Sequence, residues 1–401
     1  MARIITCFAL LWIITVGIQM VLLRSLYRNM SLSDEIEMKS MLPANMPHKK
    51  HAIAYLMAGC EASPQSSCVG YIMNVLAAKS LLDEHGFGGE LVTMIRMTSS
   101  STPKKLAQDE WLRRAGVKVQ YLPSLPVDNF ALAQLDKFRT LQMLEYDRVL
   151  YLDADAIPLC NLDYVFDASY RGYLSEYVAM GQYVSPATGS IFLVTPKEGA
   201  FQQVMSIVRE RLDKGGFNQV DGWGHVISEP DFWKSMLERG RNWTFYGAHA
   251  DQGLLYHWIK YVNKNWTLLF REYVETWRQV DDGYDSESYA LEDGTRIAMV
   301  NRSKDFNFGC NSPRYDRAPW AKYHLYADHY HFAGLRKPWF HPKPTNDTGT
   351  VEDLWWHWLS RANATWNLQL PSVLNISKPS LGGRPKKNDL VTPGLELPKR
   401  I

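Results

Sequence analysis

The chain has 401 residues, of which 46% are hydrophobic and 21% are charged, and this composition predicts a packed globular core. Its 44 basic and 42 acidic residues leave a net charge of +2. Nucleic-acid-binding proteins usually carry a clustered basic excess, so this balance argues against that class. The length suits one large domain or two ordinary ones.

The N-terminal segment from Ile4 to Leu23 is uncharged and mostly apolar. Twenty helical residues rise about 30 Å, which is the thickness of the hydrocarbon core of a bilayer. A cleaved signal peptide has a shorter apolar region that ends in small residues, whereas this run ends in Leu22-Leu23-Arg24. We therefore expect an uncleaved signal anchor over residues 4–23, preceded by a cytoplasmic tail of residues 1–3.

Glycosylation sequons indicate the orientation of this anchor better than its flanking charges do, because Arg3 precedes it while Arg24 and Arg28 follow it. Asn-x-Ser/Thr occurs more often than chance gives, which indicates exposure to the glycosylation machinery. The sequon asparagines are Asn29, Asn242, Asn265, Asn301, Asn346, Asn363 and Asn375. We expect a single-pass type II protein with a luminal body, in the Golgi or the endoplasmic reticulum membrane.

The chain has five cysteines, and Cys7 lies inside the predicted anchor. The other four are Cys60, Cys68, Cys160 and Cys310. In an oxidising lumen they allow one or two disulfides, with buried free thiols as the alternative. Their spacing matches no zinc pattern, and the pairing stays open at the level of the sequence.

Residues 24–50 are polar and read as a stem, after which short apolar strands alternate with helical patterns. The predicted strands are residues 51–59, 89–97, 117–123 and 147–155, and the predicted helices are residues 67–86, 104–116 and 132–146. This alternation predicts an α/β fold with an open, mostly parallel sheet flanked by helices. In such sheets, ligands bind beyond the carboxyl ends of the strands.

The second half of the chain is less regular. We expect strands at residues 189–196 and 323–334, helices at 198–215, 250–262 and 351–362, and a loop at 215–225. The chain contains no glycine-rich phosphate loop. We assign residues 51–345 to a catalytic domain, 346–376 to a C-terminal aromatic helix region and 377–401 to a disordered tail.

Asp153 and Asp155 follow the apolar stretch Val149 to Leu152. Alternate residues of a strand point the same way, so we expect the two carboxylates to lie together. They repel each other unless a cation lies between them or one takes up a proton. Such oxygen ligands suit Mg²⁺ or Mn²⁺ and leave coordination positions for substrate phosphates. Asp-x-Asp alone is a weak motif, and a strand or turn cap is the alternative interpretation.

The segment "HYHFAGLRKPW", His329 to Trp339, carries residues that complement the aspartates. The imidazole of His331 is a candidate third metal ligand. Gly334 allows close approach of the backbone to a ligand, and Lys337 offers a point charge to a phosphate. The alternative is an ordinary strand with a capping histidine and an exposed lysine, but the order of these residues favours a binding site.

Taken together, these segments resemble glycosyltransferase family 8, which includes glycogenins, galactinol synthases and plant glucuronosyltransferases. The resemblance covers roughly residues 51–345. It rests on "DKFRTLQMLEYDRVLYLDADAIPL" (Asp136–Leu159), "ADQGLL" (Ala250–Leu255) and "HFAGLRKPW" (His331–Trp339). It implies a GT-A fold and a retaining transfer of a glycosyl group from a UDP-sugar to a glycan, lipid or protein acceptor.

The resemblance also implies roles for individual residues. Asp153, Asp155 and His331 would be the ligands of Mn²⁺ or Mg²⁺, and Lys137 and Asp251 would lie at the reacting sugar as catalytic residues. Donor binding would fall to Lys137, Asp153, Ala154, Asp155, Thr188, Gly189, Asp251, Gln252, Gly334 and Lys337.

The chain departs from the family pattern at three places. Ala248 stands where glycogenins have an aspartate, Tyr256 replaces an asparagine, and "ATGSIFLV" replaces an Asn-Ser-Gly strand. These differences, and the predicted anchor, argue against a self-glucosylating glycogenin.

Three hypotheses follow from these features. The first is an active transferase, and the second is a non-catalytic luminal protein that binds sugar or nucleotide on a degenerate fold. A nucleotide-sugar hydrolase or nucleotidyltransferase ranks last, because "MAGCEASPQSS" lacks a phosphate loop.

Overall fold

The structure is a computed structural model. It describes residues 49–63, 66–98, 101, 104–123, 133–170, 174–181, 185–227, 243–245, 247–264, 266–270, 288–290, 296–299, 329–332, 337–343 and 351–371. The predicted anchor, the predicted tail, Gly334, Cys310 and all sequon asparagines except Asn363 lie outside these residues. Among the described helices, none has both the length and the apolar character needed to cross a membrane.

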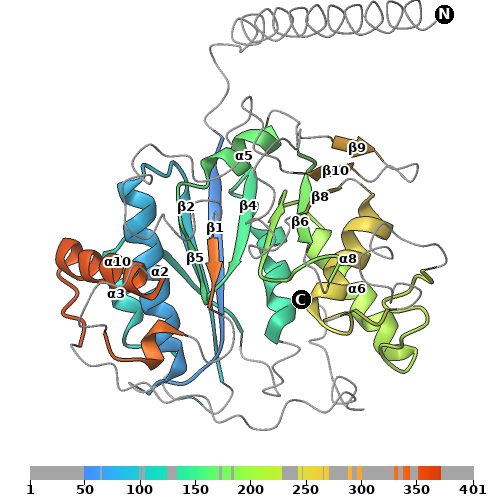
Figure 1. Cartoon of the computed structure of the whole chain (residues 1–401). Helices are drawn as coiled ribbons and strands as arrows, with labels where there is room; N and C mark the ends of the chain where they lie inside the picture. Colours follow the sequence, from blue (N-terminus) through green and yellow to red (C-terminus); the bar gives the residue numbers. More distant parts are fainter. Residues whose placement is uncertain are drawn as a thin grey trace, which may run out of the picture. The chain divides into compact units, whose positions relative to one another are not determined.

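A nine-stranded mixed sheet forms the centre of the described fold (Figure 1). Its strands lie in the order β3-β2-β1-β4-β7-β6-β8-β10-β9. The four strands from β3 to β4 are mutually parallel, β7 runs antiparallel between β4 and β6, and β6, β8 and β10 are parallel again. The predicted α/β class with a mostly parallel sheet is therefore confirmed. The strands are β1 (His51–Cys60), β2 (Glu90–Met97), β3 (Lys118–Tyr121), β4 (Arg148–Asp153), β6 (Tyr177–Gly181), β7 (Ile191–Val194), β8 (Trp266–Phe270), β9 (Ser288–Ala290) and β10 (Arg296–Met299).

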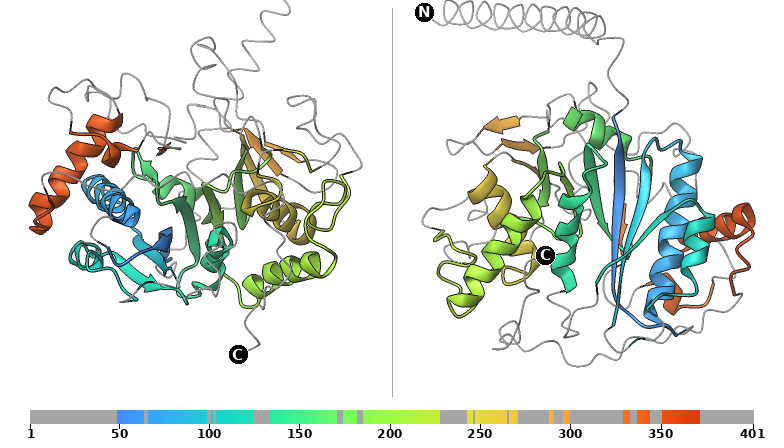
Figure 2. Two further views of the ribbon diagram at one scale, coloured as in Figure 1. Left: turned by 90° about the horizontal axis from the view of Figure 1, so that it is seen from below. Right: turned by 180° about the vertical axis from the view of Figure 1, so that it is seen from behind.

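Helices cover the sheet on both faces, as two opposite views show (Figures 1 and 2). One face carries α2 (Ser67–Glu84), α3 (Asp109–Arg114) and α10 (Val351–Trp366). The other carries η1 (Leu135–Gln142), α6 (Ala200–Asp213) and α8 (Asp251–His257), which η2 (Trp258–Asn263) prolongs. The remaining helices are α5 (Asp163–Tyr170) and η5 (Pro338–Phe340).

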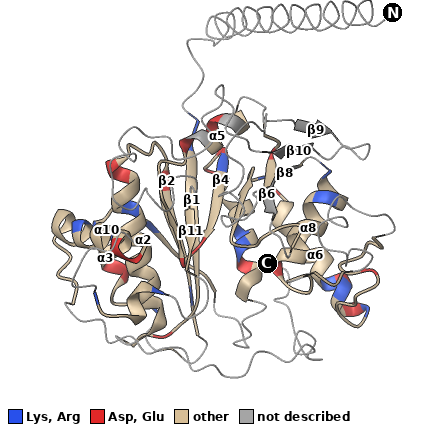
Figure 3. Ribbon diagram, in the orientation of Figure 1, with Lys and Arg blue, Asp and Glu red and all other residues tan. Residues whose placement is uncertain are grey.

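Strand β1 explains why the fold has two hydrophobic cores. Ile53 and Tyr55 pack into the core under α2 and α10, whereas Ala52 and Ala54 pack into the core under η1, α6 and α8. Successive strand residues point to opposite faces, so a strand buried on both sides must be apolar throughout. Figure 3 shows the consequence, because charged residues lie on the outer helices and at strand ends, while β1 carries none.

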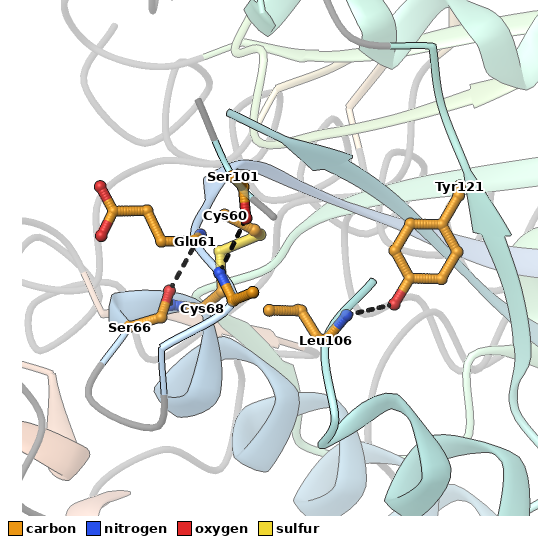
Figure 4. Close-up of a disulfide and its surroundings, with 8 residues drawn as sticks. Cys60, Glu61, Ser66, Cys68, Ser101, Leu106 and Tyr121 are labelled. Carbon is orange, nitrogen blue, oxygen red and sulfur yellow. Dashed lines mark hydrogen bonds between the residues drawn. A yellow bond between two sulfur atoms is a disulfide. The ribbon is translucent and has the colours of Figure 1, made fainter. Parts of the chain in front are cut away.

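Helix α2 is buried over most of its length between the sheet and α10. Its N-terminus is capped by Ser66, whose side-chain oxygen accepts a hydrogen bond of 3.3 Å from the Cys68 amide. A disulfide between Cys60 and Cys68 ties the carboxyl end of β1 to the first turn of this helix (Figure 4). Cys160 is disulfide-bonded as well. The sequence left both pairings open.

Two predicted helices differ from the structure. The one expected at residues 104–116 is helical only in α3, and the one expected at 132–146 is the 3₁₀ helix η1. In a 3₁₀ helix the side chains at i and i+3 eclipse. That spacing brings the Arg139 guanidinium to 2.8 Å from the Asp136 carboxylate, and the Thr140 hydroxyl donates to the Lys137 carbonyl at 2.8 Å. These i,i+3 contacts favour the tighter helix.

Gly70 gives a test of how α2 packs. A methyl group at this position would overlap the ring of Trp339, which is 1% exposed and held between other rings. Alanine in a helix normally gains about 0.5–1 kcal/mol over glycine. We predict the opposite for Gly70→Ala, a loss of about 1–3 kcal/mol in the free energy of unfolding, because the ring has nowhere to move. Urea denaturation measures it. In a Trp339→Leu background the loss should disappear, and an equal loss in both backgrounds would contradict this packing.

Candidate active site

The site is built where β4 ends. Asp153 is the last residue of β4, Ala154 and Asp155 form a turn, and β5 (Ala156–Pro158) leads away. Strand β5 pairs antiparallel with β11 (His329–His331), and His331 lies opposite Ala156. The Phe332 amide then donates to the Asp155 carbonyl at 2.8 Å. This small second sheet brings together segments that are far apart in the sequence.

Asp153, Asp155 and His331 offer one ligand atom each, and these atoms lie within 4.8 Å of one another. The Nε2 atom of His331 is 3.1 Å from an Asp155 oxygen and 3.9 Å from an Asp153 oxygen. Octahedral ligands at about 2.1 Å from a metal stand about 3 Å apart in adjacent positions and about 4 Å apart in opposite positions. The cluster therefore fits a small divalent cation in size and in donor type.

The two aspartates converge for a different reason from the one that the sequence suggested. Strand alternation predicts a shared direction, but Asp155 lies in the turn after the strand. The turn reverses the chain, and the pairing of β5 with β11 brings the Asp155 carboxylate to His331. The predicted proximity is found, while the predicted strand geometry is wrong.

Lys337 approaches the cluster from the start of η5 and is 5% exposed. Its amine donates to the Asp155 carboxylate and, at 3.0 Å, to the Phe332 carbonyl. The rings of Tyr71 and Trp339 lie 5.3 Å and 5.6 Å from the same nitrogen and shield it from water. The amine is thus a shielded positive charge that faces Asp155.

Lys137 lies on the other side of Asp153 and is 4% exposed. Its amine is 3.0 Å from Asp153 Oδ1, 2.7 Å from Asp251 Oδ2 and 3.1 Å from the Gly189 carbonyl. Asp251 is the first residue of α8, where the helix dipole favours a negative charge. Burial opposes the lysine charge, but the carboxylates of Asp153 and Asp251 raise its pKa.

The pKa values of the neighbouring groups are shifted by burial and by the charges of the same site. Burial disfavours the Asp155 carboxylate, yet hydrogen bonds and charges from His331 and Lys337 lower its pKa to about 2. Burial disfavours a charged imidazole at His331, but the bond to Asp155 outweighs it and raises the pKa. The pKa of Tyr71 is raised first by burial and then by the charges of Asp155 and Asp153.

Negative charge is in excess here. When the His331 imidazole is neutral, three carboxylates face two amines, which leaves one net negative charge. A bound diphosphate would add further negative charge. A divalent cation at the Asp153–Asp155–His331 cluster would offset that excess.

Gly189 lies close to the Lys137–Asp251 pair. A Cβ atom on Gly189 would overlap an Asp251 oxygen, so only glycine fits beside this pair. Gln252 follows Asp251 in α8, and its side-chain oxygen is buried without a hydrogen-bond partner among the described residues. A Cβ atom on Gly189 would also lie 3.3 Å from Gln252 Cγ, so both residues pack beside the Lys137–Asp251 pair.

Thr188 and Ala154, two further predicted donor-binding residues, are both buried. Thr188 is 2% exposed, and its hydroxyl bonds to the Ser190 hydroxyl at 2.8 Å. Ala154 is 5% exposed. Their role in donor binding stays a prediction, and Gly334 lies outside the described residues.

Sequence reasoning missed three residues that support the site. The Tyr151 hydroxyl donates to Asp153 Oδ1 at 2.9 Å, Tyr71 borders Lys337, and the Asn74 amide bonds to the turn that carries Asp155. Asn74 gave a signal, since it is the only strongly polar residue between Val69 and Ala78 on a helix that is otherwise apolar.

No known family model matches the chain. Three curated proteins of Arabidopsis thaliana are similar to it, and all bear names of UDP-glucuronate:xylan alpha-glucuronosyltransferases. Number 3, whose name marks that activity as provisional, is 26% identical over 224 residues, 52% of this chain and 34% of that protein. Number 2 is 26% identical over 181 residues, 42% of this chain and 29% of that protein. The chain thus spans about a third of the length of these relatives.

Solved structures give weaker likenesses. The glycosyltransferase GlyE of Streptococcus pneumoniae TIGR4 matches 81% of this chain and 66% of its own at a TM-score of 0.39 and 12% identity. The galactosyltransferase LgtC matches 77% of this chain and 95% of its own at a TM-score of 0.40 and 12% identity. TM-scores below 0.5 at such identity are too low to assign a fold or a site.

The cluster predicts metal binding with a defined dependence on pH. Mn²⁺ at 100 times its dissociation constant should add about 2.7 kcal/mol to the free energy of unfolding at pH 8. The metal needs an unprotonated His331 nitrogen, so the gain should shrink as the pH falls through the raised pKa of His331. Without metal, the free energy of unfolding should change with pH in the opposite direction. A histidine whose pKa is raised in the folded state contributes its full stability below about pH 6.5. That contribution is lost as the pH rises through the folded-state pKa.

Urea denaturation at several pH values, with Mn²⁺ or with EDTA, measures both trends. His331→Ala should abolish the gain from Mn²⁺ at every pH. A gain of the same size in His331→Ala, or one that is independent of pH in the native sequence, would contradict the assignment.

Proposed function

We propose that the chain is a retaining, divalent-metal-dependent glycosyltransferase with a GT-A fold. It moves a glycosyl group from a UDP-sugar to a glycan, lipid or protein acceptor. The single observation that carries this proposal is the convergence of Asp153, Asp155 and His331 beside the shielded amine of Lys337. The names of the Arabidopsis relatives support the donor class.

The position of the cluster supports a nucleotide-diphosphate site. It lies at the carboxyl end of β4, within the parallel half of the sheet, where α/β folds bind ligands. Asp153, Asp155 and His331 would hold Mn²⁺ or Mg²⁺, which supplies positive charge to the diphosphate of the donor. Lys337 adds a fixed charge on the same side, since its amine already pairs with Asp155.

For this reaction the protein must stabilise the leaving group and hold the sugar. Cleavage of the bond between the anomeric carbon and the UDP oxygen leaves negative charge on the diphosphate, which Lys337 stabilises where it develops. The sugar must also be held for attack from the same face, and we assign this to Lys137 and Asp251, which bond to each other at 2.7 Å. The acceptor hydroxyl adds to the anomeric carbon, and its proton passes to the leaving phosphate oxygen.

Within the UDP-sugars, UDP-glucuronate is the first donor to test, because three relatives carry it in their names. Those names also give xylan as acceptor, so xylose chains are the first acceptor to test. Ala248, 2% exposed, sets this chain apart from the glycogenins that have a carboxylate there.

We further propose a luminal location in the Golgi or the endoplasmic reticulum, with a type II anchor at residues 4–23. The disulfides at Cys60–Cys68 and at Cys160 support an oxidising compartment, because the cytosol keeps thiols reduced. The seven sequons support the same location.

A second candidate function keeps the binding site but not the catalysis. The uncharged Ala248 and the "ATGSIFLV" segment favour a protein that binds a nucleotide or glycan without turnover. Tight binding of UDP together with no UDP release from any donor would favour this alternative.

We predict release of UDP from at least one of UDP-glucuronate, UDP-glucose, UDP-galactose, UDP-xylose and UDP-N-acetylglucosamine when Mn²⁺ is present, and none in EDTA. Asp155→Asn should lower kcat/KM by about 100-fold or more, because it removes a metal ligand and the partner of Lys337. Lys137→Met should lower kcat without weakening Mn²⁺ binding, because it keeps the three proposed ligands and removes a positive charge beside Asp153.

The matched control is Asp83→Asn, which removes an exposed carboxylate of α2 whose ion pair among the described residues is with Lys79. It should leave kcat/KM unchanged. Full activity in EDTA, or equal losses in Asp155→Asn and Asp83→Asn, would overturn the proposed function.

A further inference from the structure

Asn74 is a fully buried polar residue in the middle of α2, with 0% exposure. Its side-chain nitrogen donates to the Ala154 carbonyl at 3.0 Å and to the Ala156 carbonyl at 2.8 Å. Its side-chain oxygen accepts from the Trp355 indole nitrogen at 3.0 Å. The partners dictate the orientation of the amide, because carbonyls only accept and an indole N–H only donates.

The two carbonyls that Asn74 binds flank Asp155. The backbone around them is fixed as well, since the Asp153 amide donates to the Ser190 carbonyl at 2.9 Å and the Asp155 carbonyl accepts from Phe332. The two hydrogen bonds from Asn74 have a side-chain donor, whereas the other bonds named here join backbone groups. One amide therefore holds the backbone carbonyls of the residues on both sides of Asp155.

The amide also links the turn to the C-terminal helix. Trp355 is 0% exposed and belongs to α10, which packs along α2 in the same core (Figures 1 and 2). Its indole N–H holds the Asn74 oxygen and so fixes the direction in which the amide donates. No sequence pattern connects α10 with the aspartates, because 200 residues separate Trp355 from Asp155.

Burial alone does not require this arrangement. A buried asparagine is satisfied by any set of partners, and any such set avoids the cost of an unpaired polar group. Here both N–H groups converge on one short turn, and the remaining acceptor is held from a different helix. That convergence fixes the separation of Asp153 and Asp155, which a cation with strict ligand geometry needs.

We propose that Asn74 is a positioning residue that holds the Asp153–Asp155 turn in its metal-binding geometry, and that α10 supports it through Trp355. This rests on the proposed function, because it assigns a purpose to the same metal site. Groups that orient metal ligands typically change affinity by about 10–100-fold when they are removed.

The test uses the full chain and Mn²⁺ as the probe. Asn74→Leu keeps a similar volume and no charge but removes all three bonds, and it should raise the Mn²⁺ dissociation constant by about 10-fold or more in calorimetry. Trp355→Phe keeps the ring and removes only the indole N–H, and it should raise the constant by about 3-fold. Urea midpoints in EDTA report the stability of each variant separately.

Two controls separate positioning from stability. Trp358→Phe changes a buried tryptophan of the same helix whose indole nitrogen has no partner among the described residues. Ile72→Val trims a fully buried α2 residue two positions from Asn74. Both should bind Mn²⁺ within about 2-fold of the native affinity, while Ile72→Val lowers the urea midpoint.

Native affinity in Asn74→Leu, or a loss that Ile72→Val reproduces at equal stability, would overturn the inference and leave the proposed function standing. If Asn74→Leu does not fold, Trp355→Phe decides, and native affinity there overturns the inference. A native chain that binds no Mn²⁺ would overturn both.

Discussion

The excess of carboxylate over amine at the end of β4 is the constraint on which the site depends. Asp153, Asp155 and Asp251 are brought together at the carboxyl end of β4, where partial burial reduces screening by water. Lys137 and Lys337 reduce the repulsion by direct ion pairs. The negative charge that remains when His331 is neutral favours a cation at the cluster.

That balance requires a rigid frame, and the two faces of the sheet supply it unequally. On one face η1 and α8 carry Lys137 and Asp251, which position the part of the site assigned to the sugar. On the other face α2 and α10 hold the turn that carries Asp155. The site therefore lies between the two cores. Substitutions in one core are expected to affect a different step of the reaction from substitutions in the other.

Much of the site could be predicted from the sequence, because its motifs are local. The strand that ends in Asp153, the proposed ligand His331 and Lys337 all lie in short segments with recognisable patterns. The pairing of β5 with β11 could not be predicted, since backbone hydrogen bonds between distant segments leave no periodicity. The 3₁₀ geometry around Lys137 was missed because i,i+3 contacts of the Arg139 and Thr140 side chains favour the tighter helix, and helix propensity does not report them. Asn74 shows that a single polar residue in an apolar helix indicates a hydrogen-bond partner far away in the sequence.

Crystals of the protein grown with Mn²⁺ and UDP give the most direct test of the central claim. Anomalous scattering at the manganese edge should show one strong peak about 2.2 Å from oxygens of Asp153 and Asp155 and from a nitrogen of His331. The diphosphate should complete the coordination beside Lys337. A peak bound elsewhere, or UDP bound with no manganese at these three side chains, would contradict the account.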